Sequence, residues 1–424
     1  MTQHRMSTHR GLAVLATLLT VAALVSAGVF MGVSGASGSE DRPAGHPRAL
    51  WVGTWSASPA AAEPGTHGTG HSGRTFRNVI HTSIGGSRVR VTLSNLFGVR
   101  PLRIGHASIA LAHPRERPAA APGTLRPLTF GGSPAISIPA GGEITSDAAR
   151  LPVPADADVL VSTYAPRSAA PAGPVTYHPR ARQTSYAAAG DHTHDTGAQA
   201  YTERTLSWRH LTAVDVLSDR ARGAVVVLGD SITDGSSSTV DANRRWPDVL
   251  ADRLRTSRGA PRLGVLNQGI SRNRLLTDAS SPSALSRFDR DVLSRSGVRA
   301  VVVVIGVNDI LGTPQQTDPA RITDGLRELT RRAHARGLKV VGATVMPFGG
   351  HRGHTAERDA VRRAVNGTIR AGGVFDAVVD FDRALRDPYA PDRLRPAYDS
   401  GDHLHPSDTG YRAMGRALDL TLLG

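Results

Sequence analysis

The sequence predicts a chain in two parts: a β-rich part up to residue 222, and an α/β part with a parallel sheet from residue 223 to 424. Two observations lead to this prediction. In the first part, short runs of alternating polar and apolar residues lie between glycine and proline turns, which is typical of half-buried strands. In the second part, continuous apolar runs alternate with stretches of helical spacing, which is typical of strands covered by helices on both faces.

Length and composition are those of a folded protein with more than one domain. The chain has 424 residues, of which 40% are hydrophobic and 20% charged, and a domain has roughly 150 residues. The absence of cysteine excludes disulfide scaffolds, thiolate metal sites, iron–sulfur clusters and a cysteine nucleophile. The net charge of +14 comes almost wholly from scattered arginines, so we expect a basic surface and no nucleic-acid site. Loose association with a membrane or cell wall stays open, as does the oligomeric state.

Residues 1–40 predict export from the cytoplasm. Arg5 and Arg10 precede an uncharged apolar stretch at residues 11–33, and residues 25–27 offer a place for cleavage. About 23 helical residues span roughly 34 Å, so a retained membrane anchor is the alternative. Glycines and Thr20 weaken such a helix, and we favour a cleaved signal and a secreted protein. Both alternatives leave most of the chain outside the cytoplasm.

Residues 41–222 are predicted to form a β-sandwich-like accessory domain. Residues 88–94 alternate between polar and apolar side chains, as a half-buried strand does. Further strands are expected at residues 104–111, 135–138, 159–164 and 211–217. Glycine pairs and Pro/Ala-rich loops separate these runs, and helical periodicity of useful length is missing. Two packed sheets are therefore favoured.

Residues 223–424 are predicted to form the α/β domain. Residues 225–228 make a continuous apolar strand, and residues 246–254 follow with helical spacing. Strands are expected again at 265–266, 300–305, 340–345 and 377–381, and helices at 284–293, 322–333, 360–369 and 411–418. About five parallel strands between two helical layers make a flavodoxin-like three-layer sandwich. Reactive groups in such a sheet gather at the carboxyl ends of the strands.

Three polar segments follow strands of this domain. Ser231 follows the first strand and can present its hydroxyl at a strand-to-helix turn, although serine is also a common helix cap. Gly269 ends the second strand, where its N–H could donate to a developing oxyanion or merely form a turn. Asn308 follows the third strand, where its amide could donate as well, but asparagine is also a common turn residue.

A fourth segment, Asp402 to His405, precedes the last helix. A neutral imidazole oriented by a carboxylate is the base that a serine nucleophile requires, and residues three apart on one turn can pair. His403 is next to Asp402, so its side chain is expected to point elsewhere. A capping aspartate and a surface histidine would explain either residue alone. All four segments lie at strand ends of one domain, and this combination is far more specific than any of them.

These segments resemble the conserved blocks of the SGNH hydrolases of the GDSL type. Ser231 matches the nucleophile of the first block, Gly269 the glycine of the second and Asn308 the asparagine of the third. Asp402 and His405 match the pair of the fifth block. The resemblance covers residues 224 to 423 and implies a three-layer α/β fold. It also implies an esterase, lipase, arylesterase, thioesterase or carbohydrate deacetylase that needs no metal or other cofactor.

The sequence departs from the family pattern at two places. Ile232 stands where the family name implies leucine, a common variant that leaves the chemistry untouched. After Gly269, Arg272 stands in a turn that is richer in glycine in close relatives. We expect Arg272 to reach the acyl or alcohol pocket and to affect substrate specificity rather than activity.

The first part also resembles known proteins. Residues 51–59 and 89–95 resemble the extra region of secreted actinobacterial GDSL esterases. The two-part layout of the chain is similar to that of arylesterases found alongside xylanases in gut bacteria. A stabilising β-domain is favoured here, because sparse aromatic residues mostly fill the core. The alternative is a carbohydrate-binding module with Trp51, Trp55 or Trp208 as stacking platforms.

The resemblance implies a mechanism of acyl transfer. His405 takes the proton of Ser231 as the hydroxyl attacks an ester carbonyl, and Asp402 fixes the imidazole tautomer. Because His405 must be neutral, we expect activity to fall below about pH 6 to 7. The expected substrates are acyl lipids, aryl esters or acylated carbohydrates.

Backbone and side-chain donors complete the expected site. The N–H groups of Ser231 and Gly269 and the amide of Asn308 hold the oxyanion, and loss of one donor costs about 100- to 1,000-fold in rate. Asp230 and Asp309, which stand beside two of these residues, are expected to support the site.

Two other functions remain as alternatives to an esterase. An acyltransferase would use the same acyl-enzyme, and a non-catalytic glycan-binding protein would use the fold as a scaffold. Residues 68–73 satisfy G-x-G-x-x-G but lack the flanking strand and helix of a dinucleotide site. Residues 191–195 combine His and Asp in a loop, where solvent-facing histidines are a better explanation than a metal site.

Overall fold

The computed structural model describes residues 49–67, 70–167 and 173–424. The predicted export segment at residues 1–40 lies outside these ranges, as does the start of the G-x-G-x-x-G stretch. In the described ranges, every helix is too short or too polar to cross a membrane.

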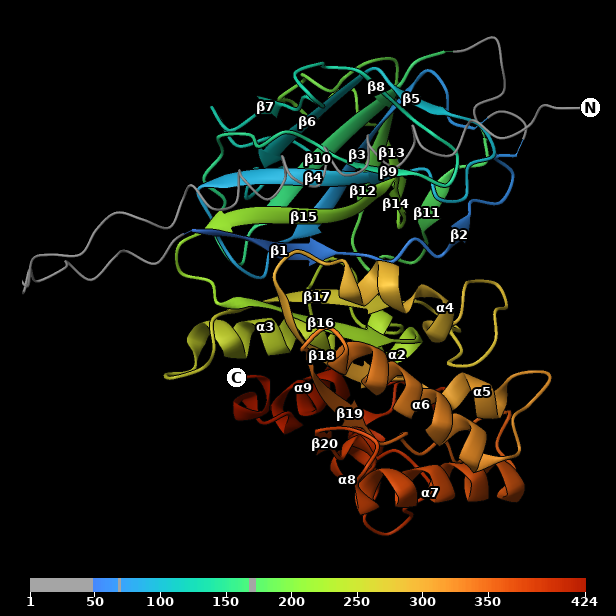
Figure 1. Cartoon of the computed structure of the whole chain (residues 1–424). Coiled ribbons are helices and arrows are strands. Elements are labelled where there is room, and N and C mark those ends of the chain that lie inside the picture. Colours follow the sequence, from blue (N-terminus) through green and yellow to red (C-terminus); the bar gives the residue numbers. More distant parts are fainter. Residues whose placement is uncertain (1–48, 68–69, 168–172) are drawn as a thin grey trace, which may run out of the picture. The chain divides into compact units, whose positions relative to one another are not determined.

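The second part of the chain is built on one parallel five-stranded sheet (Figure 1). The strand order is β17 (Leu263–Gly269), β16 (Gly223–Gly229), β18 (Val298–Val304), β19 (Lys339–Ala343) and β20 (Ala377–Val379). The first strand in the chain, β16, lies between the second and the third, which is the flavodoxin-like order. Residues 224–228 of β16 are fully buried because helices cover both faces of the sheet. The predicted three-layer α/β fold is confirmed.

Eight α-helices connect and cover these strands in the described part of the chain. They are α2 (Ser231–Asp234), α3 (Trp246–Thr256), α4 (Ala284–Phe288), α5 (Val307–Leu311), α6 (Pro319–His334), α7 (Ala356–Ala371), α8 (Phe381–Leu385) and α9 (Asp408–Ala417). A π-helical segment, Asp289–Leu293, continues α4, and two 3₁₀ segments, Pro396–Tyr398 and Leu420–Leu423, complete the set. Helix α6 shows why the sequence folds in this way. Asp318 caps its first turn, and an apolar stripe from Ile322 to Ala333 is buried.

The first part of the chain is mostly antiparallel sheet, as predicted. A four-stranded sheet has the order β1 (Leu50–Ser56), β15 (Leu211–Ser218), β4 (Arg88–Ser94) and β9 (Glu143–Thr145). A six-stranded sheet has the order β13 (Glu203–Thr205), β12 (Ser185–Ala189), β3 (Arg74–His81), β10 (Asp158–Ala165), β6 (His106–Leu111) and β7 (Arg126–Pro127). Smaller sheets are formed by β14 (Trp208–Arg209), β11 (Thr176–His178) and β2 (Ala61–Ala62), and by β5 (Leu102–Ile104) and β8 (Ile136–Ile138).

One apolar core lies between the two larger sheets. Val89 and Val91 of β4 meet Val159 and Val161 of β10 there, and all four are fully buried. Trp55 and Trp208 also belong to this core, with their ring centroids 4.9 Å apart. Both are at most 5% exposed, so neither offers a face to a sugar ring. The two tryptophans therefore serve packing, as the stabilising-domain alternative expects.

Strand β1 of the first part lies directly against β17 of the parallel sheet. A β-carbon on Gly264 would come within 2.2 Å of the Gly53 carbonyl oxygen, so glycine is needed for the backbones to approach. The Gln268 amide donates to the Ser56 hydroxyl at 2.7 Å, and Val265 N–H donates to the Ser83 hydroxyl at 2.9 Å. The predicted boundary near residue 222 falls between β15 and β16. The division of the chain at this boundary into two domains stays a prediction.

Replacing Gly264 by alanine is expected to destabilise the fold by about 1–3 kcal/mol, because the new methyl group overlaps a backbone oxygen. Gly367→Ala is the matched control. Gly367 lies inside α7 with nothing within 4 Å of a new β-carbon, so this exchange should stabilise by about 0.5–1 kcal/mol. Urea unfolding measures both. Equal effects of the two substitutions would contradict the close approach of β1 and β17.

Candidate active site

The turn between β16 and α2 presents Ser231. This residue is the first of a four-residue helix, and its hydroxyl lies at the carboxyl end of the sheet. The Asp230 carboxylate caps the helix by accepting the Ile232 N–H at 2.9 Å. Gly235, with a φ of 98°, ends the helix in the left-handed conformation that favours glycine. The backbone N–H of Ser231 has no hydrogen-bond partner among the described residues.

Ser231, His405 and Asp402 lie in one hydrogen-bonded chain. The Ser231 Oγ is 2.8 Å from the His405 Nε2, and the His405 Nδ1 is 2.6 Å from the Asp402 Oδ2. The other Asp402 oxygen accepts the backbone N–H groups of Leu404 and His405 at 3.0 and 2.8 Å. Partial burial alone would raise the pKa of Asp402, but the hydrogen bonds from His405 outweigh it and lower that pKa. The carboxylate is thus kept charged beside the imidazole.

His403 lies apart from this chain, as expected. Its Nδ1 pairs with the Asp399 carboxylate at 2.6 Å. Its φ of 63° turns the backbone between Asp402 and His405, which helps these two side chains to meet.

Ser231, His405 and Asp402 line an open pocket of about 980 Å³ together with Asn308 and Arg272. Asn308 follows β18 in the first turn of α5. Its Nδ2 donates to the Asn273 carbonyl at 3.0 Å, and a side-chain amide has a second N–H to offer. The structure thus brings together four of the five residues predicted for the triad and the oxyanion hole.

Gly269 is the predicted residue that does not line this pocket. Its N–H donates to the Asn267 Oδ1 at 2.9 Å, so the donor expected at the oxyanion is used within the protein. A β-carbon on Gly269 would lie 2.2 Å from the Asp234 nitrogen. This glycine therefore allows α2 to pack closely against β17.

Arg272 has the backbone conformation that glycine favours. Its φ is 65°, in the left-handed region, and its N–H has no partner among the described residues. The preceding Ser271 donates both its N–H and its hydroxyl to the Asp234 Oδ2, at 3.0 and 2.8 Å. The sequence indicated this position because the turn is richer in glycine in relatives. The positive φ explains that preference, since glycine adopts this conformation without strain.

Residues 227–413 match the GDSL-like Lipase/Acylhydrolase family. This segment is a GDSL-like lipase/acylhydrolase domain. The chain is accordingly a carboxylic ester hydrolase, as the conserved blocks predicted. Comparison with curated protein sequences finds no relative of the chain.

Several solved structures are similar to the GDSL-like domain. A GDSL-like lipase from Bacteroides thetaiotaomicron shares 20% identity with a TM-score of 0.35, over 47% of this chain and 87% of that one. The aryl esterase of M. smegmatis shares 17% identity with a TM-score of 0.36, over 46% and 95%. Est24, a carbohydrate acetylesterase from Sinorhizobium meliloti, shares 18% identity with a TM-score of 0.35, over 46% and 95%.

A histidine of the first part contacts helix α2 of the GDSL-like domain. His178 of β11 lies with its Nε2 3.0 Å from the Asp234 Oδ1, while its Nδ1–H donates to the Ser58 carbonyl at 2.8 Å. Both side chains of the pair are at most 6% exposed. Burial alone would lower the pKa of His178, but the Asp234 carboxylate raises it, which favours a charged pair. Nothing in the sequence around His178 indicates this role, because its partner Asp234 lies in α2, 56 residues further along the chain.

The two expected supporting carboxylates of the GDSL-like domain are buried. Asp309 accepts the Leu275 and Leu276 N–H groups at 2.8 and 3.0 Å, which fixes the chain after the Arg272 turn. Burial raises the pKa of Asp309 despite these bonds. Burial likewise raises the pKa of Asp230 to about 7, and the nearby Asp309 and Asp234 carboxylates add to this effect.

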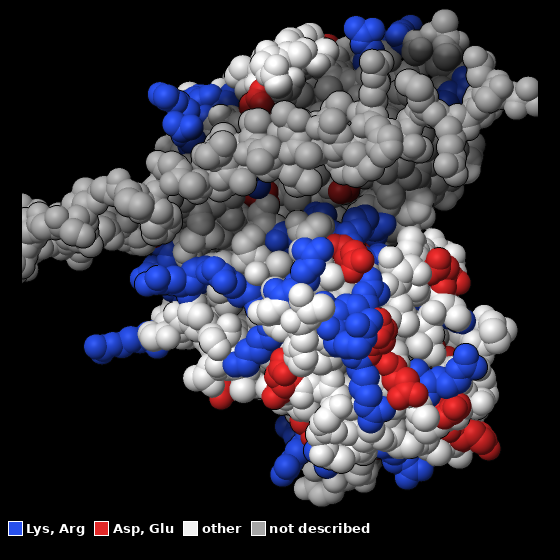
Figure 2. All heavy atoms as spheres, viewed as in Figure 1, with Lys and Arg blue, Asp and Glu red and all other residues white. Residues whose placement is uncertain are grey.

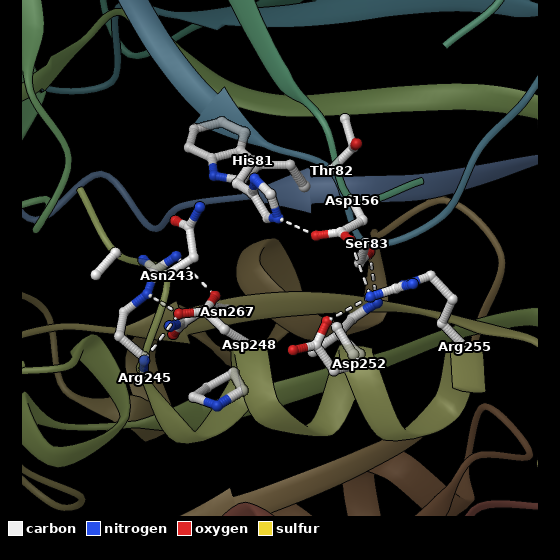
Figure 3. Close-up of a pocket in the computed structure, with 15 residues that line it drawn as sticks. His81, Thr82, Ser83, Asp156, Asn243, Arg245, Asp248, Asp252, Arg255 and Asn267 are labelled. Atoms are coloured by element: carbon white, nitrogen blue, oxygen red, sulfur yellow. Dashed lines mark hydrogen bonds and ion pairs between the residues drawn. The ribbon is translucent and has the colours of Figure 1, made fainter. Parts of the chain in front are cut away.

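A second pocket, of about 190 Å³, lies between the first part and α3 of the GDSL-like domain (Figure 3). Its charged side chains pair with one another: His81 with Asp156 at 3.1 Å, Arg255 with Asp156 and Asp252 at 2.9 Å, and Arg245 with Asp248 at 2.8 Å. Ser231 and His405 are absent from its lining. Among the described residues, including 191–195, no cluster of His, Asp or Glu is arranged to hold a metal ion.

His178→Phe is expected to destabilise the protein by about 3–5 kcal/mol, because it keeps a ring but leaves the Asp234 carboxylate buried without its partner. His334→Phe is the control. His334 is half exposed and pairs with Asp376 at 2.9 Å, so its loss should cost no more than about 1 kcal/mol. Urea unfolding at pH 6 measures both. A loss at His178 as small as that at His334 would contradict the importance of the buried pair.

The stability of Asp230→Asn relative to the wild type is expected to increase as pH rises. The folded-state pKa of Asp230 is raised to about 7, against an ordinary value near 4, so its contribution to stability is present at low pH and lost between about pH 4 and 7. The neutral amide avoids this loss, which amounts to at most about 4 kcal/mol. Unfolding free energies at pH 4.5, 6 and 8 measure the difference. A difference between the variant and the wild type that stays constant over these three pH values would refute the raised pKa of Asp230.

Proposed function

We propose that the chain is a secreted serine esterase in which Ser231, His405 and Asp402 form the catalytic triad. The proposal is carried by the contact of 2.8 Å between the Ser231 Oγ and the His405 Nε2 in a GDSL-like domain. The contact of 2.6 Å between His405 and Asp402 supports it. Secretion is proposed from residues 1–40, whose basic start and apolar stretch are typical of an export signal.

The reaction begins with proton transfer from Ser231 to the Nε2 of His405. The serine oxygen bonds to the ester carbonyl carbon and forms a tetrahedral intermediate. Its collapse breaks the bond to the alcohol, which leaves with the proton from His405. Water then attacks the acyl-enzyme, with His405 as base, and releases the carboxylic acid. Asp402 keeps the proton of His405 on Nδ1, so that Nε2 is free to accept.

Three donors are proposed to hold the oxyanion. The first two are the Ser231 N–H, at the positive end of α2, and the second N–H of the Asn308 amide. The third donor is the N–H of Arg272, which has no partner among the described residues. The Gly269 N–H is not proposed for this role because it already donates to the Asn267 side chain. Arg272 lines the same pocket as Ser231 and Asn308.

The first part of the chain is proposed to be a stabilising domain at residues 41–222, preceding the hydrolase domain at residues 223–424. Its support is the packing of β1 against β17 and the contact between His178 and Asp234. In this proposal the first part determines how rigidly the site is held.

Ser231→Ala is expected to lower kcat/KM at least about 1,000-fold on every ester that the wild type hydrolyses. Short and long p-nitrophenyl esters and acetylated xylan, assayed with the protein lacking residues 1–40, measure the loss. A fluorophosphonate probe should label the wild type and not the variant. Ser280→Ala, in the same pocket but outside the triad, is the control and should keep the labelling.

Equal rates for the wild type and Ser231→Ala would remove the nucleophile from the proposal. A wild type that turns over no ester and takes no label would instead favour the non-catalytic binding protein. An added alcohol acceptor detects an acyltransferase, because the acyl group then appears on the acceptor rather than as free acid.

A further inference from the structure

The pocket that contains Ser231 and His405 carries an excess of positive charge. Its lining includes four arginines: Arg180, Arg272, Arg274 and Arg352. Among the described residues that line it, Asp402 is the one acidic residue, and its carboxylate is bound to His405. On the face of the α/β part seen in Figure 2, basic and acidic side chains are interspersed instead. The lining of the pocket therefore has a net positive charge.

The four guanidinium groups form no ion pair with the described residues. Arg180, Arg272 and Arg352 are exposed. The charge of Arg274 lowers the pKa of Asp309, but burial of Asp309 has the larger effect and raises that pKa. Many other arginines of the chain do have a carboxylate partner, such as Arg362 with Asp382 at 2.7 Å. The charge of the pocket is thus left for another molecule to compensate.

One of these arginines is held in place without being neutralised. The Arg274 guanidinium donates to the Thr313 carbonyl at 2.9 Å and to the Pro314 carbonyl at 3.2 Å. Carbonyl oxygens orient a guanidinium but carry no net charge. Arg274 therefore presents a fixed positive charge at the pocket.

The arginines come from separate segments. Arg180 follows β11 of the first part, while Arg272 and Arg274 follow β17. Arg352 lies between β19 and α7. A substrate at Ser231 therefore meets positive charge from more than one segment of the chain. Apolar lining is limited to small or single side chains, Ala279, Leu311 and Leu404, which does not suit a long acyl chain.

We propose that this esterase selects substrates that carry a carboxylate in addition to the ester that is cut. The proposal rests on the proposed function, since it places the ester at Ser231. Guanidinium groups bind carboxylates through two parallel hydrogen bonds, which a neutral ester cannot form to the same extent. The carboxylate belongs either to the acyl group or to the alcohol, and the two are separated by the choice of substrate.

Two pairs of esters of matched size test the proposal. 4-Nitrophenyl hemiglutarate and 4-nitrophenyl valerate differ by a carboxylate on the acyl side. 4-Acetoxybenzoate and its methyl ester differ by a carboxylate on the alcohol side. The acyl-side pair shares one leaving group, so its kcat/KM values are compared directly after the enzyme-free rate is subtracted. The alcohol-side pair has different leaving groups, so each kcat/KM is divided by the rate of spontaneous hydrolysis. We expect the anionic member of at least one pair to be favoured about 5- to 10-fold at low salt. This preference should vanish in 1 M NaCl, where charges are screened beyond about 3 Å.

Single substitutions locate the preference. Arg180→Gln and Arg352→Gln should each lower the anionic-to-neutral ratio about two- to fivefold in the favoured pair. Arg336→Gln is the matched control, because Arg336 is exposed after α6, lies outside the pocket and changes the net charge equally. It should leave the ratio unchanged. Both kcat/KM values in the ratio are measured on the same protein sample. A partial loss of folded enzyme therefore lowers both values equally and leaves their ratio unchanged.

The outcomes separate this inference from the proposed function. A wild type that hydrolyses neutral esters through Ser231, with a ratio of one or less in both pairs, overturns the inference alone. A ratio lowered equally by Arg336→Gln assigns the preference to the overall charge and also overturns it. Absence of hydrolysis for every ester, together with absence of labelling at Ser231, refutes the proposed function itself.

Discussion

The buried carboxylate of Asp234 joins the three segments on which the candidate site depends. It lies in α2 together with Ser231. One of its oxygens accepts the N–H and hydroxyl of Ser271, and the other lies 3.0 Å from the His178 ring. A buried carboxylate without partners is costly, so each of these contacts is strongly favoured. The turn at Ser231, the turn at Arg272 and β11 of the first part are therefore fixed relative to one another.

A buried arginine makes a second connection of the same kind. Arg287 of α4 donates to the Gly229 carbonyl, just before the turn at Ser231, at 3.0 Å. It also donates to the Asn273 side chain at 3.1 Å and to the Ser58 hydroxyl of the first part at 2.8 Å. Two oppositely charged side chains thus tie the same two turns to the same β part. The first part of the chain is accordingly in direct contact with the side chains that support the site.

The sequence predicted what local patterns determine. Uninterrupted apolar runs identified the buried strand β16, and the motif residues Ser231, His405 and Asp402 meet as the strand-end rule requires. It could not predict contacts that depend on long-range packing. The partner of His178 is Asp234 in α2, 56 residues further along the chain. The use of the Gly269 N–H by Asn267, only two residues away, depends on how the side chain of Asn267 is turned, which the residue spacing does not show.

Arg272 departs from the family pattern, and its backbone and its side chain have separate consequences for the site. Its φ is positive, as glycine favours, and its N–H has no partner among the described residues, so the backbone can serve the proposed oxyanion hole despite the large side chain. A non-glycine residue in this conformation costs about 1 kcal/mol or more, and the contacts of Ser271 with Asp234 offset that strain. The side chain meanwhile adds a charge to the pocket wall. In the proposed mechanism, the backbone of this residue supports the rate while its side chain contributes to the choice of substrate.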